Sequence, residues 1–197
     1  MQSIFKEMLN ELDKMLKGYR YYTMERTHAR QVMDYGIILS ERENSDMDIV
    51  VPATIFHDVG RYIGLPNHRE VDFDTLSSIL KKFRYADNQI HSVQGCIRTH
   101  SINSKQKPST IEQKVVFDSD NLTLITPFGT TRWFFMAEEW GGVTNIKDAI
   151  ENLAAIYQKI DEKEFFYTDT ARKIANKNTF FRTYIEDLTQ EVNKFKL

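Results

Sequence analysis

The sequence predicts an all-α protein, and three observations carry that prediction. Apolar residues recur at intervals of three and four in most segments, which is the spacing of amphipathic helices. Few segments alternate apolar and polar residues as a half-buried strand does. Glycine and proline residues fall mainly between the helical patterns. At 197 residues the chain suits a single domain that buries about 70% of its unfolded surface.

The first two helices are expected over residues 3–17 and about 24–40. The first pattern stops at Gly18, a residue type that commonly ends helices. In the second pattern His28 falls close to the apolar face, so its side chain is expected to point inward.

The third helix is expected to begin at an Asp46 or Asp48 cap and to run into the pair His57-Asp58. Consecutive helical residues point about 100° apart, so both side chains can reach one ion only near a helix end or a break. Gly60 is expected to supply that break.

Turns and helices alternate through the rest of the chain. Turns are expected near residues 64–67, 104–109 and 141–142, and Pro127 with Gly129 is expected to separate two helices. The run 133–136 is apolar on all sides and is expected to be buried. The remaining helical patterns cover residues 71–83, 90–100, 111–122, 146–160 and 168–195.

The composition describes an ordinary soluble surface. A formal net charge of −2 with 27% charged residues gives no electrostatic argument for nucleic acid or an anionic membrane as the main partner. A local cluster of Arg and Lys can still bind a phosphorylated small molecule. Cys96, the single cysteine, suits a reducing compartment and a buried position. Without a leader or an apolar run of about 18 residues, we expect a cytoplasmic protein; oligomerisation stays open.

Five candidate metal ligands lie on three expected helices. Imidazole and carboxylate groups together suit Mn²⁺, Fe²⁺ or Zn²⁺, with Mg²⁺, Ni²⁺ and Co²⁺ as alternatives, whereas an all-oxygen set would favour Mg²⁺ or Ca²⁺. In chain order the candidates are His28, His57, Asp58, Asp118 and Asp120.

Three stretches place these candidates in a familiar order: a His on one helix, a His-Asp pair ending the next and an Asp on a later one. They are Thr27–Val32, Phe56–Arg61 and Val115–Leu122. The order resembles the HD-domain metal-dependent phosphohydrolase superfamily, in particular its small bacterial single-domain members. The string at 118–122 departs from the family's Asp-Ala-Asp-Arg-Leu at Ser119 and Asn121. Residues 168–175 and the pair 180–181 also look similar to the tail of those members.

The resemblance implies an HD-domain helical bundle with additional C-terminal helices. It implies one domain over residues 1–197, with the ligands carried by a core of about 22–125 and the extra helices at about 130–195. It also implies a metal site formed by His28, His57, Asp58 and Asp120, with Asp118 as the fallback for the last ligand.

A second ion is a further possibility that the resemblance raises. Some HD families hold two ions, the second bound by two more histidines, and His68 and His100 stand where those histidines would stand. His91 has no counterpart in the pattern. A mixed-valent di-iron oxygenase, which needs six ligands, is a remaining alternative.

A metal site of this kind suits hydrolysis of a phosphoester or phosphoanhydride, because a divalent ion makes its bound water more acidic and polarises a phosphoryl oxygen. Asp58 is expected to orient or deprotonate the attacking water. Arg61, one turn beyond Asp58, is expected to pair with a substrate phosphate. Weaker candidates for that pairing are Arg26, Arg30, Lys105 and Lys107.

The resemblance implies a nucleotide substrate, cleaved as a monoester or at a pyrophosphate bond. Three aromatic residues could stack on a base, although core packing is their more common use; they are Tyr22, Tyr62 and Trp133. The alternative function is a non-catalytic HD module that binds a metal or nucleotide and regulates a partner protein. The aromatic content, 12% of the chain, is the feature that supports this alternative.

Overall fold

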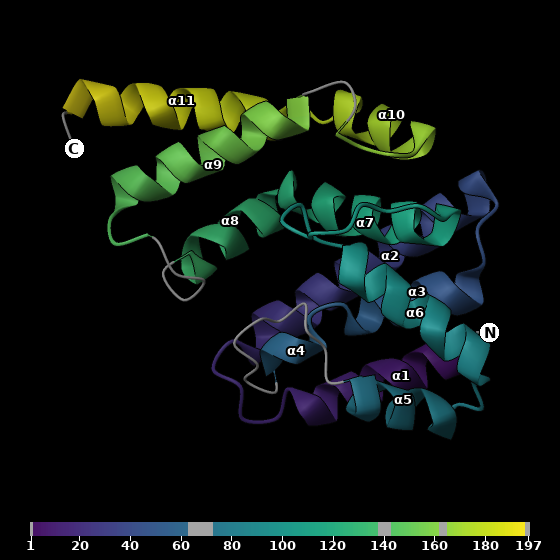
Figure 1. Cartoon of the computed structure of the whole chain (residues 1–197). Coiled ribbons are helices and arrows are strands. Elements are labelled where there is room, and N and C mark those ends of the chain that lie inside the picture. The colour runs from purple at the N-terminus through teal and green to yellow at the C-terminus, as the bar shows by residue number, and fades with distance from the viewer. Residues whose placement is uncertain (1, 63–72, 138–142, 162–164, 196–197) are drawn as a thin grey trace. The chain divides into compact units, whose positions relative to one another are not determined.

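The all-α prediction is confirmed. The computed structural model describes residues 2–62, 73–137, 143–161 and 165–195, and within these ranges the chain forms eleven helices and no strand (Figure 1). The turns expected at 64–67 and 141–142, and His68, lie outside the described residues. No helix in the described ranges is both long enough and apolar enough to span a bilayer.

Contacts divide the chain into two compact units, Met1–Asn121 and Leu122–Leu197. The candidate ligands that the structure describes all belong to the first unit. The organisation as a single domain with an attached set of C-terminal helices stays a prediction.

The first two helices are α1, Gln2–Met15, and α2, Tyr22–Glu43. Gly18 follows α1 with a φ of +88°, a left-handed conformation that glycine adopts without a steric penalty. His28 is buried on the inner face of α2, as its position in the apolar pattern predicts.

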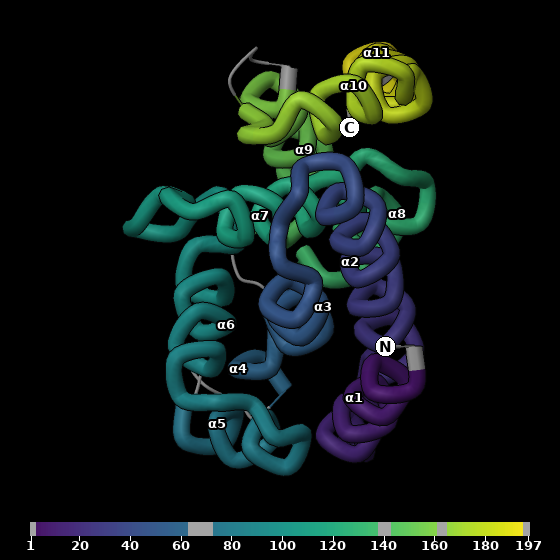
Figure 2. The backbone as a smooth tube through the Cα atoms, turned by 90° about the vertical axis from the view of Figure 1, so that its right-hand side faces the viewer, coloured from purple at the N-terminus to yellow at the C-terminus, as the bar shows by residue number. Residues whose placement is uncertain are grey.

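Helix α3, Met47–Phe56, is the centre of the first unit. Asp46 caps it by accepting a hydrogen bond from the backbone N–H of Asp48 at 2.9 Å. Every residue from Ile49 to Phe56 is buried, because α3 packs against α1, α2 and α6. Figure 2 shows α3 flanked by α2 and by α6, Asp87–Thr99. A helix that is apolar on all sides is stable only in such a position.

The break after α3 lies earlier than the sequence predicts. Helix α3 ends at Phe56, His57 and Asp58 form a turn, and Gly60 lies inside the next helix, α4, Val59–Tyr62. The turn at the pair itself, rather than the glycine after it, therefore lets both side chains reach one region.

Two more helices complete the first unit together with α6. They are α5, Phe73–Lys82, and the part of α7, Ile111–Leu124, that carries Asp118 and Asp120. Cys96 on α6 is buried, as expected, and burial raises the pKa of its thiol.

The second unit contains the remaining helices. Thr126 caps the first of them by accepting from the N–H of Gly129 at 3.1 Å, with Pro127 in the first turn, where proline fits best. The helices are α8, Pro127–Met136; α9, Ile146–Asp161; α10, Asp169–Lys177; and α11, Phe180–Phe195.

Two expectations for this unit are wrong. The run 133–136 is not buried throughout: Trp133 and Met136 are buried, but Phe135 is 62% exposed, because successive residues of α8 face different directions. The pattern at 168–195 is two helices, interrupted where Asn178 turns to extended backbone and its side chain donates to the carbonyl of Ile125 at 2.9 Å.

Helices α2 and α3 approach each other closely at Gly36. A Cβ atom at this position would lie 2.9 Å from Cγ2 of Thr54 and 3.2 Å from Cγ1 of Val50. Overpacking of this kind costs about 1–3 kcal/mol, more than the ~1 kcal/mol that alanine gains over glycine within a helix. We therefore expect Gly36→Ala to lower the free energy of unfolding by about 1 kcal/mol in urea denaturation.

The control for this prediction is the Thr54→Ser background, which removes the methyl group that the new Cβ would meet. There Gly36→Ala should be neutral or stabilising. An equal loss of stability in both backgrounds would show that the contact with Thr54 does not limit the approach of the two helices.

Candidate metal centre

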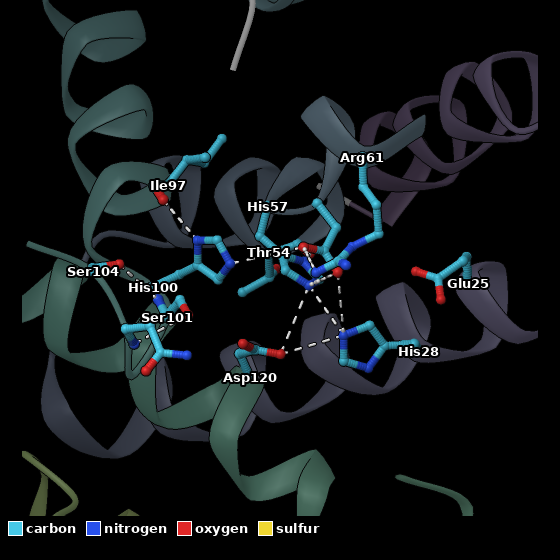
Figure 3. Close-up of polar contacts among 12 residues, drawn as sticks. Glu25, His28, Thr54, His57, Arg61, Ile97, His100, Ser101, Ser104 and Asp120 are labelled. Carbon is cyan, nitrogen blue, oxygen red and sulfur yellow. Dashed lines mark hydrogen bonds and ion pairs between the residues drawn. The ribbon is translucent and has the colours of Figure 1, made fainter. Parts of the chain in front are cut away.

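Three segments of the first unit bring His28, His57 and Asp120 together. The Nε2 atoms of His28 and His57 lie 3.1 Å apart. Oδ1 of Asp120 lies 3.3 Å from Nε2 of His28 and 3.7 Å from Nε2 of His57. The three side chains each offer one ligand atom, and these atoms all lie within 4.8 Å of one another (Figure 3). We call this group the three-residue cluster.

Asp58 joins the cluster with one oxygen and faces away from it with the other. Its Oδ2 lies 3.4 Å from Nε2 of His57 and 4.0 Å from Nε2 of His28. Its Oδ1 lies 3.4 Å from Nη2 of Arg61 and 3.8 Å from Nε2 of His100. Asp58 therefore stands between the cluster and a second pair of nitrogen-bearing side chains.

Backbone carbonyl groups set the orientation of two of the rings. Nδ1 of His57 donates to the carbonyl of Thr54 at 2.8 Å, and Nδ1 of His100 donates to the carbonyl of Ile97 at 2.7 Å. A carbonyl oxygen only accepts, so Nδ1 of each ring carries a proton, and Nε2 is the nitrogen that can bind a metal ion once it carries none. Hydrogen bonds of this kind fix the ring orientation in metal sites.

Electrostatics in the cluster favour positive charge. Burial is the strongest influence on His57 and opposes its charged form, but Asp58 and Asp120 outweigh it and raise the pKa of His57 to about 9. Burial likewise opposes the charged form of Asp120, yet a hydrogen bond from His28 and the charge of His57 hold the pKa of Asp120 below its usual range. Burial and His57 together lower the pKa of His100.

The chemistry of these groups fits a divalent cation. Imidazole nitrogens and carboxylate oxygens converge on one point, and such acceptors repel one another unless a proton or a cation lies among them. Two nitrogens and two carboxylates form a donor set that first-row transition ions bind well. The residues could therefore hold such an ion.

Asp118 is fully buried but does not belong to the cluster. Two residues along an α-helix differ by about 200° in direction, so Asp118 and Asp120 on α7 cannot face the same point. This geometry favours Asp120 as the ligand over the fallback. His91 is exposed, and its Nδ1 lies 2.6 Å from the carbonyl of Asp87.

Among the basic residues expected to bind phosphate, Arg61 lies beside the cluster. Arg26 forms an ion pair with Asp13 at 2.6 Å, and Arg30 forms one with Asp34 at 3.6 Å. Lys105 and Lys107 are exposed in the segment before α7.

The three aromatic residues proposed for base stacking lie in different places. Tyr22 lines a surface pocket of about 400 Å³ together with Asp13 and Lys14. Tyr62 packs on the ring of Tyr19 and donates its hydroxyl to a carboxylate. Trp133 belongs to the second unit and is buried.

Glu25 is not among the site residues predicted from the sequence, yet it is fully buried on α2 one turn before His28. Its Oε2 accepts a hydrogen bond from the hydroxyl of Tyr62 at 3.1 Å. Because Glu25 and His28 are three residues apart, they lie on one helix face, and this spacing could have indicated that Glu25 also points inward. The roles of the Thr54 and Ile97 carbonyl groups cannot be predicted from a pattern of side chains, because every residue has a backbone carbonyl group.

The arrangement predicts that Asp120, and not Asp118, is needed for tight metal binding. Asp120→Asn removes a charged ligand oxygen and should weaken Mn²⁺ binding by at least about tenfold. Asp118→Asn, the matched control on the same helix, should leave the affinity within about threefold. Electron paramagnetic resonance of free Mn²⁺ measures both, with circular dichroism to show that each variant is folded. The reverse order of effects would assign the ligand to Asp118.

Comparison with known proteins agrees with this arrangement. The profile of the HD domain family matches residues 26–125, about half of the chain. The uncharacterized protein YpgQ of Bacillus subtilis (strain 168) is 25% identical over 170 residues, covering 84% of this chain and 82% of YpgQ.

Solved structures share the fold. The structure of Bacillus subtilis YpgQ in complex with ADP has a TM-score of 0.71 and 23% identity, covering 95% of this chain and 97% of that one. An HD-superfamily hydrolase from Bacillus thuringiensis has a TM-score of 0.72 and 20% identity over 98% of each chain. With the profile match across the segment that carries the cluster, these findings show that the chain belongs to the HD domain family.

Proposed function

We propose that this protein is a metal-dependent phosphohydrolase that cleaves a phosphoester or phosphoanhydride bond of a nucleotide. The observation that carries the proposal is the position of Asp58. One of its oxygens faces the three-residue cluster, and the other lies 3.4 Å from a guanidinium nitrogen of Arg61. A cation site and an anion-binding side chain thus lie on either side of one carboxylate, as phosphoryl transfer to water requires.

The residues that would hold the ion are His28, His57, Asp58 and Asp120. Mn²⁺, Fe²⁺ and Zn²⁺ match this donor set, with Mg²⁺, Ni²⁺ and Co²⁺ as alternatives. When bound, the ion supplies Lewis acidity, which polarises a phosphoryl oxygen and makes a water molecule more acidic. His100, 3.8 Å from Oδ1 of Asp58, is the described residue that would bind a second ion.

The exposure of the side chains supports an approach of the substrate from the side of Asp120 and Arg61. The side chains of His28, His57 and Asp58 are at most 5% exposed, whereas Asp120 is 21% and Arg61 17% exposed. A phosphate group that enters beside Asp120 and Arg61 would meet the guanidinium before the buried histidines. Burial of the histidines also excludes bulk water, which strengthens every charge interaction at the site.

Within this proposal Asp58 and Arg61 have separate roles. Arg61 pairs with the substrate phosphate and keeps the leaving group in a fixed direction. Asp58 orients the attacking water and accepts its proton. Support for a nucleotide comes from YpgQ, which was solved in complex with ADP.

Asp58→Asn tests the proposal. We expect the protein with added Mn²⁺ to release phosphate or pyrophosphate from members of a panel of nucleoside mono-, di- and triphosphates. Loss of the general base should lower kcat by at least about 10²-fold. The matched control is Asp34→Asn, an exposed aspartate on α2, which should leave kcat unchanged. Nucleotide binding without turnover in the wild type would favour the non-catalytic regulatory module instead.

Arg61→Met is expected to raise KM for the same nucleotide by about tenfold, because a charge-assisted contact to phosphate is lost. Arg61→Lys should restore only part of the loss, since lysine lacks the planar fork of donors. Arg30→Met removes an arginine that pairs with Asp34 instead, and should leave KM unchanged. Steady-state kinetics on each variant check this, and an unchanged KM in Arg61→Met would remove Arg61 from the phosphate site.

A further inference from the structure

We propose that Glu25 is a positioning residue that holds Arg61 in place through the hydroxyl group of Tyr62. This inference rests on the proposed function, because the purpose of the arrangement is to direct Arg61 toward a substrate phosphate. Glu25 does not belong to the three-residue cluster and was assigned no role by its sequence pattern.

Arg61 lies on the segment that follows the turn at His57 and Asp58. The described residues of α4, Val59–Tyr62, begin directly after that turn. The local support of this helix includes the bond from the backbone N–H of Arg61 to the carbonyl of Asp58 at 2.9 Å. Tertiary contacts of the neighbouring residue Tyr62 can hold the backbone that carries Arg61.

Tyr62 makes two of these tertiary contacts. Its hydroxyl donates to Oε2 of Glu25 at 3.1 Å, across 37 positions of sequence. Its ring packs against the ring of Tyr19, with centroids 5.7 Å apart and planes tilted by 59°. Tyr19 lies in the connection between α1 and α2. The side chain next to Arg61 is thus held both by α2 and by the segment that precedes α2.

Burial of Glu25 makes its bond to Tyr62 stronger than a surface contact. Glu25 has no exposed surface, and a buried carboxylate is costly unless donors satisfy it. A hydrogen bond to a charged acceptor is roughly twice as strong as one between neutral groups. The bond from Tyr62 is therefore among the contacts that offset the cost of burying Glu25.

The positions of Glu25 and Tyr62 link the two halves of the proposed site. Glu25 precedes His28 by one turn of α2, and Tyr62 directly follows Arg61. Figure 3 shows the carboxylate end of Glu25 turned toward the cluster, on the side where His28 and Arg61 lie. This hydrogen bond therefore links α2, which carries a cluster histidine, to α4, which carries the arginine proposed to bind phosphate.

The test compares five single variants, one of them Arg61→Met, and the double variant of Arg61→Met with Tyr62→Phe, all in the full chain and with ADP as the probe. Tyr62→Phe removes the donor and Glu25→Ala removes the acceptor, while Glu25→Gln keeps an oxygen that can accept. Tyr35→Phe on α2 is the matched control for loss of a phenolic hydroxyl. Calorimetry measures ADP affinity with and without Mn²⁺, and kinetics measure KM and kcat separately.

We expect Tyr62→Phe and Glu25→Ala to weaken ADP binding and to raise KM by about fivefold to tenfold, with kcat within about twofold. Glu25→Gln and Tyr35→Phe should both keep ADP affinity and KM close to those of the wild type. In the Arg61→Met background Tyr62→Phe should cause no further loss of ADP affinity, because its effect acts through Arg61.

Two results would overturn the proposal. One is wild-type ADP affinity in Tyr62→Phe, which remains decisive if Glu25→Ala fails to fold. The other is an equal loss from Tyr62→Phe with and without Arg61, which would indicate a general structural role. If the wild type binds ADP but hydrolyses no nucleotide, the proposed function fails, while these binding measurements still decide the role of Glu25.

Discussion

The convergence of buried hydrogen-bond acceptors on one point is the constraint on which the first unit depends. His28, His57, Asp58 and Asp120 come from three places in the sequence, and their ligand atoms meet within a few ångströms. Such an arrangement is unfavourable in an apolar interior unless positive charge offsets it. The carboxylates raise the pKa of His57, and the histidines lower the pKa of Asp120, because these groups lie so close together. A divalent cation would offset the repulsion among these acceptors by binding several of them at once.

The helix packing keeps these groups in place. Helix α3 is buried along nearly its whole length and ends directly before His57. Its last turn supplies the Thr54 carbonyl that orients the His57 ring, and the side chain of Thr54 is also the closest contact of Gly36 on α2. Thr54 therefore affects both how closely α2 approaches α3 and how the His57 ring is oriented. A substitution at Thr54 would change the helix packing and the site together.

Much of the fold follows from local sequence, because helical periodicity reports which face of each segment is apolar. The expected turn at Gly18 and the cap at Asp46 are also found, because glycine adopts left-handed backbone easily and an aspartate side chain accepts from the free N–H groups of a helix start. The prediction that the run 133–136 is fully buried is wrong at Phe135, because four consecutive apolar residues show no periodicity that separates a buried face from an exposed one. The interruption at Asn178 depends on a bond to Ile125, 53 positions away, and is invisible to a local pattern.

For the site, the order of His28, His57-Asp58 and the acidic pair is present in the sequence, but periodicity does not choose between Asp118 and Asp120. The choice came from the resemblance, and the opposite directions of the two side chains on α7 give it a physical basis. Glu25 stands in the first turn of a helix, where acids are usually solvated and favourable to the helix dipole. Its burial and its partner Tyr62 become evident only in three dimensions.

Anomalous X-ray diffraction at the manganese edge, from crystals grown with Mn²⁺, tests the central claim most directly. The account predicts a strong anomalous peak bounded by His28, His57, Asp58 and Asp120, with any second peak beside His100. Strong peaks confined to other parts of the molecule, with none among these four side chains, would contradict it.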